Sequence, residues 1–574
     1  MRYLNFKSKY DKNPIINLSS DEKLLFSGFD EIINELSKFK KGVLAFESYV
    51  GVNNDNLLTN IIEKLNPDKV IFIEDFSKTK EEIETLIKRN LTDDRVFGVM
   101  SHFTIDEFYH EETILKLNNE IDKNKLTIVY GFGASLIDYD HLVPVSITRW
   151  EIQLRYRQGL SNFKAENYKE DVLRKYKRGF FVEWRVADRV KKEVYPNANY
   201  IIDLNDDNLP VMISKEEYFN ALKQTTKRPF RMVPYFDPGV WGGQWMKEVC
   251  NLDKSKENYA WSFDGVAEEN SVKFGYGNKT IHFPAQDIVM FEPIALMGEH
   301  VHARFGLNLP IRFDLLDTMD GQNLSLQVHP RTEYIYDKFG MMYTQDESYY
   351  LLDTEEDGII YLGFKNDVNK EDFERDMLAA EKGEISFPAE KYVNTYKAHK
   401  HDHFLIPAGT IHCSARNTMV LEISACTYIF TFKMWDWDRL GLDGRPRPVH
   451  LQHGFKNVQY NYNKDFVESN LINRFERIDD NTEVTGLHQR EFLRTVRYTF
   501  DKPQKVAINH NVLLGNLVEG QEAIIYSNNN EFEPYKIHYA ETFVIPATFS
   551  EVMVKPVNEN EKCIIVIAQV KDYA

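Results

Sequence analysis

The secondary-structure pattern changes once along the chain, and this change limits the folds that the chain can adopt. Between residues 42 and 204, segments with strand character alternate with segments of helical periodicity. From about residue 228 onward, short β-rich runs are separated instead by Gly, Pro, Asn and Asp. Strands separated by helices predict a parallel sheet, whereas strands separated by turns predict a barrel or sandwich. We therefore expect a multidomain chain, with an α/β parallel-sheet domain followed by a mainly-β region.

The α/β part should contain four strands and three helices. The strands are expected at residues 42–47, 70–74, 126–131 and 200–204, and the helices at 55–65, 80–89 and 104–119. A polar segment, NDDNLP, follows the last strand and indicates a domain edge. A chain of 574 residues is long enough for two to four domains. We expect domains at 1–215, 225–480 and 485–574, the second with a helix at 369–382.

The composition is typical of a folded protein from a reducing compartment. The four Cys residues are far apart without a CxxC pair, and no apolar stretch reaches 18 residues. We therefore expect a cytoplasmic protein without a membrane segment. The formal net charge of −18 argues against binding to nucleic acid or to anionic membranes, because these partners require a positive surface. The sequence leaves the oligomeric state open.

Two features of the α/β part concern anion binding. The turn after the first strand, SYVGVNNDN at 48–56, lies where a nucleotide-binding fold places its phosphate loop, but it lacks the GxxxxGK[ST] sequence. GFGASL at 131–136 is only a partial glycine match. Residues 149–192 contain 13 Lys and Arg against 6 Asp and Glu. Two interpretations stay open, a solvated helix face and a phosphate site formed by Arg149, Arg155, Arg178 and Arg185.

In the mainly-β part, four residues form a set of metal-binding side chains. Gln327 and His329 are two residues apart in an alternating run, so a strand places both on one face. Glu347 follows 18 residues after His329, and His412 comes directly after the turn at 407–410. These nitrogen and oxygen donors suit a borderline divalent cation, zinc first, with water or substrate completing a catalytic site. Taken alone, either His is more often a packed or hydrogen-bonded residue than a ligand.

The metal-binding set belongs to a longer series of motifs. The series comprises VWGGQWM at 240–246, LSLQVHP at 324–330, LGF at 362–364, PAGTIH at 407–412, LEI at 421–423 and DWDRLGLDGRPRPVH at 436–450. In this order the motifs resemble those of the type I phosphomannose isomerases, zinc enzymes of the cupin superfamily. The resemblance covers roughly residues 228–460. The α/β part before it resembles a nucleoside-kinase-like fold with a degenerate phosphate loop.

The resemblance implies a double-cupin fold and a zinc-dependent aldose–ketose isomerase that interconverts mannose 6-phosphate and fructose 6-phosphate. One Zn²⁺ per chain would be held by the four residues of the set. The segment 538–554 is similar to a second cupin half without metal ligands, because Phe549-Ser550-Glu551 stands where a ligand His is expected. That second barrel is expected to be structural.

The family's pattern also implies residues for catalysis and for binding a small hexose phosphate. Glu422, in the LEI strand, is a candidate proton relay, with a salt-bridged strand carboxylate as the alternative. Lys433 aligns with a catalytic Arg of the family, and it keeps the charge without the planar fork. The substrate-binding candidates are Arg439, Arg445 and Arg447, for which a solvated loop is the alternative.

One departure from the family lies beside the metal-binding set. Gln345 stands two residues before Glu347, where the family usually carries a Lys, and Gln can act neither as a base nor as a cation. A second function therefore stays open, that of a regulatory cupin that binds sugar phosphate without turning it over. A third alternative makes the α/β part a nucleotide- or sugar-binding module fused to an isomerase.

Overall fold

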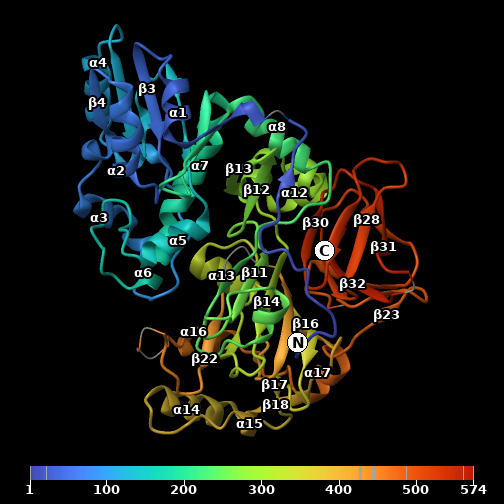
Figure 1. Ribbon diagram of the computed structural model, residues 1–574. Coiled ribbons are helices and arrows are strands. Elements are labelled where there is room, and N and C mark those ends of the chain that lie inside the picture. Colours follow the sequence, from blue (N-terminus) through green and yellow to red (C-terminus); the bar gives the residue numbers. More distant parts are fainter. Residues whose placement is uncertain are drawn as a thin grey trace. The chain divides into compact units, whose positions relative to one another are not determined.

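The computed structural model describes residues 2–20, 22–425, 430–442, 444, 447–486, 488–559 and 561–572. The chain folds into two compact units. Unit 1 comprises Met1–Pro14, Thr225–Asn270 and Glu292–Ala574, and unit 2 comprises Ile15–Gln224 and Ser271–Phe291. Unit 2 contains a parallel sheet with helices, and unit 1 contains several antiparallel sheets (Figure 1). The predicted multidomain architecture with an α/β parallel-sheet region is confirmed.

The central strands of unit 2 run parallel. One sheet has the order β4-β5-β3-β6, with β3 (Gly42–Glu47), β4 (Lys69–Phe72), β5 (Leu126–Gly131) and β6 (His141–Leu142). A second has the order β2-β9-β8-β7, with β2 (Leu25–Ser27), β7 (Val145–Ser146), β8 (Tyr200–Asp203) and β9 (Val211–Ser214). A parallel bridge between Ser48 and Val145 joins the two sheets. All residues of β3 and β5 are buried, as in strands covered on both faces.

The helices of unit 2 before residue 226 are α1 (Gly28–Leu36), α2 (Asn54–Leu57), α3 (Lys80–Leu91), α4 (Glu111–Glu120), α5 (Arg149–Arg157), α6 (Val172–Arg178), α7 (Trp184–Val194) and α8 (Lys215–Thr225). Helical structure is present at the three expected segments, with two differences, whereas α1 and α5 to α8 were not among the expected helices. The helix expected at 55–65 is α2 followed by a π turn and a 3-10 turn. The helix expected at 104–119 is interrupted, because Tyr109 forms a β-bridge with Ser77 and hydrogen-bonds the carbonyl of Phe132. A 3-10 helix at Ile105–Phe108 precedes this point and α4 follows it.

A segment from far along the chain completes unit 2. Strands β12 (Ser271–Tyr276) and β13 (Lys279–Pro284) form a hairpin, and β12 pairs in parallel with β1 (Ile16–Asn17). The following helix, α10 (Gln286–Phe291), brings in Asp287. Its buried carboxylate accepts hydrogen bonds from Lys191 at 2.7 Å and from the Tyr218 hydroxyl at 2.7 Å. The expected boundaries at 215 and 225 did not assign this hairpin to the α/β part.

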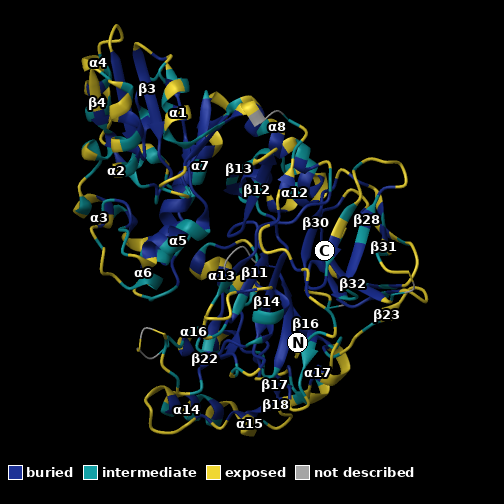
Figure 2. Cartoon of the chain, viewed as in Figure 1, coloured by how far each residue is buried: buried dark blue, intermediate teal, exposed yellow. Residues whose placement is uncertain are grey.

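The middle of unit 1 consists of two antiparallel sheets. The first has the order β10-β11-β14-β21-β16-β19, with β10 (Tyr235–Asp237), β11 (Trp261–Gly265), β14 (Arg312–Asp317), β16 (Glu347–Thr354), β19 (His403–Ile406) and β21 (Thr418–Ser424). The second has the order β18-β17-β20-β15-β22, with β15 (Leu326–Val328), β17 (Ile359–Phe364), β18 (Val393–Lys397), β20 (His412–Ser414) and β22 (Phe432–Trp435). These strands are buried almost throughout (Figure 2).

Short helices connect these strands. They are α9 (Trp245–Val249), α11 (Pro293–Met297), α12 (Glu299–Phe305), α13 (Thr332–Phe339), α14 (Lys370–Glu381), α15 (Ala389–Tyr392), α16 (Leu451–Asn457) and α17 (Lys464–Asn470). Helix α14 is the one expected at 369–382. It begins after Asn369, whose side chain accepts a hydrogen bond from the backbone N–H of Asp372, as an N-cap residue should.

The C-terminal part of unit 1 contains a second pair of antiparallel sheets. One has the order β23-β24-β25-β32-β27-β30, with β23 (Glu476–Arg477), β24 (Thr482–Val484), β25 (Leu493–Phe500), β27 (Leu513–Glu519), β30 (Thr542–Ile545) and β32 (Cys563–Val570). The other has the order β26-β31-β28-β29, with β26 (Gln504–Ala507), β28 (Glu522–Tyr526), β29 (Tyr535–His538) and β31 (Glu551–Pro556). The core between them is apolar and includes Phe543 and Phe549.

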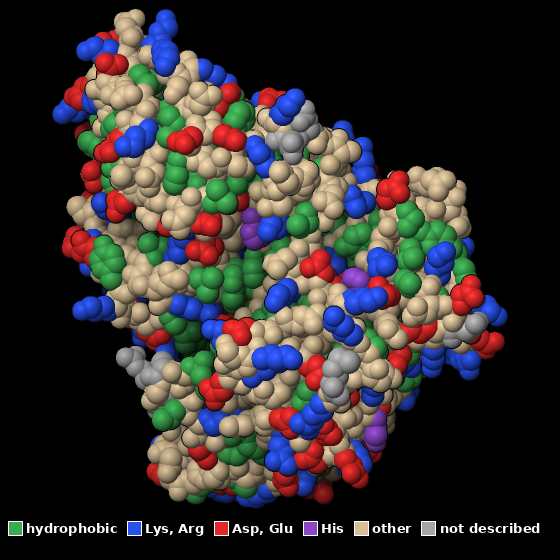
Figure 3. Space-filling view, in the orientation of Figure 1, with side chains coloured by type: hydrophobic (Ala, Val, Ile, Leu, Met, Phe, Trp, Pro, Cys, Tyr) green, Lys and Arg blue, Asp and Glu red, His purple; other side chains and the backbone are tan. Residues whose placement is uncertain are grey.

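Two surface properties bear on partners. Among the described residues, every helix is too short or too polar to span a bilayer. On the face drawn in Figure 3, acidic and basic side chains are interspersed rather than gathered by sign. The chain as a whole carries 88 Asp and Glu against 70 Lys and Arg, so a broad basic surface has no support in its composition.

Candidate metal centre

The two middle sheets of unit 1 bring the four residues of the predicted metal set together. Gln327 on β15 lies directly opposite His412 on β20, so the two side chains leave the same face of the five-stranded sheet. His329 follows one residue after β15. Glu347 begins β16 in the six-stranded sheet. All four side chains are buried.

Three of these side chains converge on one point. Nε2 of His329 lies 2.7 Å from Oε2 of Glu347, and Nε2 of His412 lies 3.3 Å from Oε1 of the same carboxylate. One ligand atom from each of the three residues lies within 4.8 Å of the others. Gln327 joins this group through its amide nitrogen, 3.1 Å from Nε2 of His412, while its oxygen accepts from Ser325 at 3.1 Å. The chain thus has a His–Glu–His group that could hold a metal, with Gln327 beside it.

The hydrogen bonds of the two imidazole rings prepare them for a cation. Nδ1 of His329 lies 2.9 Å from the carbonyl of Phe430, and Nδ1 of His412 lies 2.8 Å from the carbonyl of Thr410. A carbonyl can only accept, so each Nδ1 carries a hydrogen and Nε2 is the atom that faces Glu347; in a neutral ring that Nε2 offers its lone pair to a cation. Two lone pairs and a carboxylate that face one another are the donor set of a divalent cation. The residues present therefore fit a zinc ion.

The charges around Glu347 agree with this fit. Burial alone would raise the pKa of Glu347, but the two imidazole rings outweigh it and hold that pKa well below its usual range. Burial alone would lower the pKa of His329, but the nearby carboxylate of Glu347 has a larger opposite effect. The pKa of His329 therefore lies above its usual value. The pocket therefore keeps Glu347 ionised, as a metal-ligating carboxylate must be.

A second layer of polar residues surrounds the His–Glu–His group. The amide nitrogen of Gln345 donates to Oε2 of Glu347 at 3.1 Å and to Oε1 of Glu422 at 3.1 Å. Glu422 also accepts from the Ser424 hydroxyl at 3.0 Å. Burial raises the pKa of Glu422 well above its usual value, and the nearby Glu347 and Asp314 raise it further. Glu422 is thus a buried carboxyl beside the metal group whose protonated form is favoured by its surroundings.

Lys433 lies on the strand next to Gln327. In the pairing of β15 with β22 the two residues are direct partners, so their side chains leave the same face of the sheet. Lys433 is half-buried. Its role toward a bound substrate stays a prediction. The strand pairing places Lys433 on the face of the sheet that also carries Gln327.

The sequence analysis missed two charged residues of this region, Arg312 and Asp314 on β14. Across β14, β21 and β16, Arg312, Ser424 and Glu347 form one row of direct partners. Asp314, Glu422 and Tyr349 form the next row on the same face. Arg312 donates to the carboxylate of Asp314 at 2.5 Å, and both are buried. Only the pairing register could reveal these rows, because no motif spacing links β14 to β21.

The arginines predicted to bind substrate lie on a loop after β22. Arg439 pairs with Asp436 at 2.8 Å, and Arg447 donates to both oxygens of the same carboxylate at 2.9 and 3.0 Å. Asp436 is buried, so this segment is not simply a solvated loop. Arg445 lies outside the described residues. Substrate binding by these arginines stays a prediction.

The four arginines of the predicted anion site in unit 2 all contact carboxylates. Arg149 and Arg185 meet on Asp188, at 2.8 and 3.3 Å. Arg155 pairs with Glu151 and Asp207, each at 3.0 Å, and Arg178 pairs with Glu183 at 2.7 Å. Arg149, Arg155 and Arg178 are buried, so the alternative of a solvated helix face does not describe them. The phosphate site stays a prediction; of its four residues, Arg149 and Arg185 share Asp188 as a partner.

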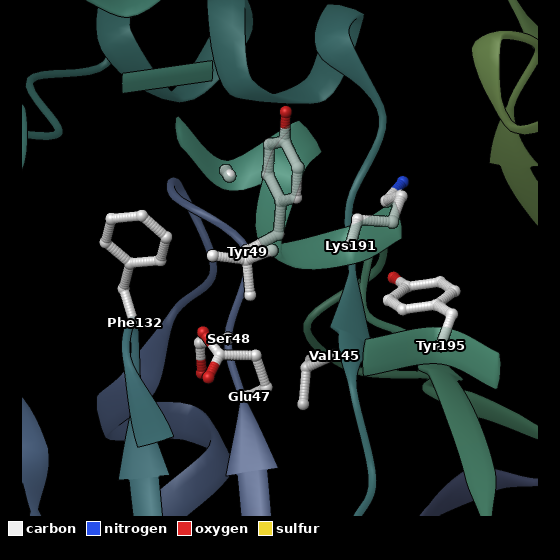
Figure 4. Close-up of a pocket in the computed structure, with 9 residues that line it drawn as sticks. Glu47, Ser48, Tyr49, Phe132, Val145, Lys191 and Tyr195 are labelled. Carbon is white, nitrogen blue, oxygen red and sulfur yellow. The ribbon is translucent and has the colours of Figure 1, made fainter. Parts of the chain in front are cut away.

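Unit 2 has a small cavity at the carboxyl end of its parallel strands. It is lined by Glu47, Ser48, Tyr49 and Lys191, among others, and its volume of about 10 Å³ is that of about one water molecule. Figure 4 shows Phe132 on one side of Tyr49, with Lys191 and Tyr195 on the other. The turn that replaces a phosphate loop thus packs against other side chains.

The partial glycine motif at 131–136 binds carboxylates of its own chain. The N–H groups of Gly133 and Ser135 donate to Glu47 at 2.8 and 2.6 Å, and that of Phe132 donates to Glu74 at 3.0 Å. Burial raises the pKa of Glu47 to about 7 and that of Glu74 to about 7. These donors of the glycine motif are occupied by internal carboxylates.

Comparison with known proteins separates the two parts of the chain. Residues 28–227 match the model of a domain of unknown function, DUF8485. The chain is 24% identical over 327 residues to a probable mannose-6-phosphate isomerase of Bacillus subtilis, GmuF, which covers 56% of this chain and 95% of that protein. It is 25% identical over 237 residues to the mannose-6-phosphate isomerase ManA of the same organism, covering 41% and 69%. The resemblance to mannose-6-phosphate isomerases is thereby confirmed.

Two solved structures align with part of the chain. A mannose 6-phosphate isomerase from Bacillus subtilis aligns over 60% of this chain and 99% of its own, with 18% identity and a TM-score of 0.48. A mannose 6-phosphate isomerase bound with zinc and yttrium aligns over the same shares, with 15% identity and a TM-score of 0.45.

Proposed function

We propose that the chain is a zinc-dependent aldose–ketose isomerase that interconverts mannose 6-phosphate and fructose 6-phosphate. The observation that carries the proposal is the buried His–Glu–His group, in which both imidazole rings are fixed by backbone carbonyls with Nε2 toward Glu347. Relatives named as mannose-6-phosphate isomerases support the substrate. The site would take one Zn²⁺ per chain.

The proposed fold of unit 1 is a double cupin. The first barrel would be the six- and five-stranded sheets at 225–480, with the metal group between them. The second, at 485–574, would be the six- and four-stranded sheets, whose apolar core leaves it a structural role. The α/β part at about 1–215, with the hairpin 271–291, would be a separate module, and its ligand is open.

The reaction moves a proton between the two carbons that carry the aldehyde and the neighbouring hydroxyl. It passes through an enediol, so the pocket must accept a proton and stabilise negative charge on the sugar oxygens. Glu422, with its raised pKa, is suited to hold a proton between these oxygens. Lys433 would stabilise the negative charge. A bound Zn²⁺ would supply a Lewis acid for the same oxygens.

The substrate's phosphate requires cations outside this group. Arg439, Arg447 and Arg445 remain the proposed residues, since the first two lie on the loop that follows the strand of Lys433. Guanidinium groups suit a phosphate because their fork of N–H donors matches its oxygens. The net charge of −18 again argues against nucleic acid and anionic membranes as partners, and we propose a cytoplasmic location.

A second candidate function rests on Gln345. The family's Lys at this position supplies a cation, whereas Gln345 supplies an amide that donates to two carboxylates. A chain that binds sugar phosphate without turning it over would be a regulatory protein. A coupled assay with mannose 6-phosphate separates the two functions. Turnover that EDTA abolishes supports the isomerase, whereas thermal stabilisation by mannose 6-phosphate without turnover supports the binder.

A further inference from the structure

We propose that Gln345 binds a hydroxyl group of the sugar through its amide oxygen, and so helps to determine which sugars the metal pocket accepts. This inference rests on the proposed function, because it takes the ligand of the pocket to be a sugar phosphate. It gives the residue that replaces the family's Lys a role of its own.

The orientation of the Gln345 amide is fixed by its neighbours. Its nitrogen lies 3.1 Å from Oε2 of Glu347 and 3.1 Å from Oε1 of Glu422. The ionised Glu347 can only accept, so an amide turned the other way would bring its oxygen against that carboxylate. The nitrogen therefore faces the two acids, and the oxygen faces away from them.

That oxygen is a buried acceptor without a donor. The Gln345 side chain is 3% exposed, and its Oε1 has no hydrogen-bond partner among the described residues. A buried amide oxygen left in this state is unfavourable, and such atoms in native proteins normally meet water or a ligand. The nitrogen of the same amide lies 3.1 Å from Glu347, and the nitrogen and oxygen of an amide share one carbon, so the unpaired oxygen lies beside the His–Glu–His group. We take a ligand bound at that group as its partner.

The chemistry of the partner follows from the surrounding charges. An amide oxygen requires a donor, and the donors of a sugar phosphate are its hydroxyl groups. The phosphate offers acceptors, and the ionised Glu347 beside the amide would repel it. Gln345 therefore meets the polyol end of the sugar. A Lys at the same place would instead donate, so this chain and relatives with Lys should differ in the hydroxyl pattern that they select.

The test compares ligands that differ by one oxygen. Dissociation constants of the zinc-loaded chain are measured by calorimetry for mannose 6-phosphate and for its analogues lacking the hydroxyl at carbon 1, 2, 3 or 4. At least one analogue should bind about 10- to 100-fold more weakly than the parent, because the buried acceptor stays unpaired. In Gln345→Met, which keeps the size but has no acceptor, that difference should fall to about twofold or less.

A second variant and a control keep the result unambiguous. Gln345→Leu has neither a donor nor an acceptor, so it must lose the same discrimination whatever its turnover, and Gln504→Met in the C-terminal sheets should keep it. If Gln345→Met weakens the parent and every analogue by one common factor, or if the native chain discriminates against no analogue, the inference is wrong while isomerase turnover still supports the proposed function. If the native chain neither binds nor converts mannose 6-phosphate, the proposed function itself fails, and this inference with it.

Discussion

Asp314 and Glu422 are direct partners on adjacent antiparallel strands, and both carboxyl groups are buried. Two like charges placed opposite each other in a sheet repel. Arg312, two residues before Asp314 on the same face, donates to Asp314 and lowers the cost of this arrangement. Burial still raises the pKa of Asp314 to about 6. The wall of the metal pocket therefore contains several acids around one buried guanidinium.

Removing that guanidinium should destabilise the chain strongly. Arg312→Met would leave Asp314 without its cation, and breaking a buried ion pair typically costs about 3–5 kcal/mol of unfolding free energy. Urea unfolding would measure the loss at neutral pH. The double variant Arg312→Met/Asp314→Asn should recover much of the stability, since the unpaired charge is gone. A loss of under about 1 kcal/mol in the single variant would show that the pair contributes little.

Zinc content should depend on the two imidazole rings. We expect the chain purified without a His tag to contain about one zinc per chain, and His329→Ala with His412→Ala to reduce it to background, because a single carboxylate rarely retains zinc. Elemental analysis would measure the content. His399→Ala is the matched control, since His399 is exposed and pairs with Asp402. Equal zinc in the native chain and the double variant would contradict the proposed centre.

Turnover should depend on the charge of Lys433. Lys433→Met should lower kcat by about 10²–10³, the usual effect of losing one group that stabilises a developing oxyanion. Zinc content and melting temperature should stay nearly unchanged. Lys433→Arg should keep part of the activity because the charge remains. Native-like turnover in Lys433→Met, or a loss of stability alone, would make Lys433 an ordinary strand residue.

The stability of the parallel sheet in unit 2 should fall as pH rises through 7. Burial raises the pKa of Glu47 to about 7, above its unfolded value, so its favourable contribution is complete at low pH and is lost as the folded group ionises. Glu47→Gln cannot ionise and should lose about 1–2 kcal/mol less between about pH 6 and about pH 8.5. Hydrogen exchange of peptides covering β3 and β5, corrected for intrinsic rates, would report the difference. Parallel pH profiles in both proteins would refute the role of Glu47.

The sequence was informative where the signal is local. The strands expected at 42–47 and 126–131 have those bounds in the structure, because continuous apolar runs flanked by polar turns specify buried strands. The spacing of Gln327 and His329 likewise predicted that both leave one face near β15. These inferences need only the period of a strand.

The features that the sequence did not predict depend on contacts between residues that are far apart in the chain. The pairing of β14 with β21 places Arg312 and Asp314 beside Ser424 and Glu422. The orientation of Gln345 is set by contacts with two carboxylates on different strands. The hairpin at 271–291 has the turn pattern of the mainly-β region, so its sequence alone assigned it there. Its membership of unit 2 arises from pairing with β1 and from the contact between Lys191 and Asp287. The periodicity of the sequence does not show which unit such a segment joins.

The division of the two units along the chain has a consequence for how the protein is made. The chain passes from one unit to the other after residues 14, 224, 270 and 291. During synthesis, the α/β unit can acquire its last strands only when Phe291 has left the ribosome, by which time the first segments of unit 1 are already exposed. Most of unit 2, residues 15–224, is therefore synthesised before its last segment, and residues 225–270 of unit 1 are made in between. A chaperone that binds the emerging segment 225–270 would act before residues 271–291 complete unit 2.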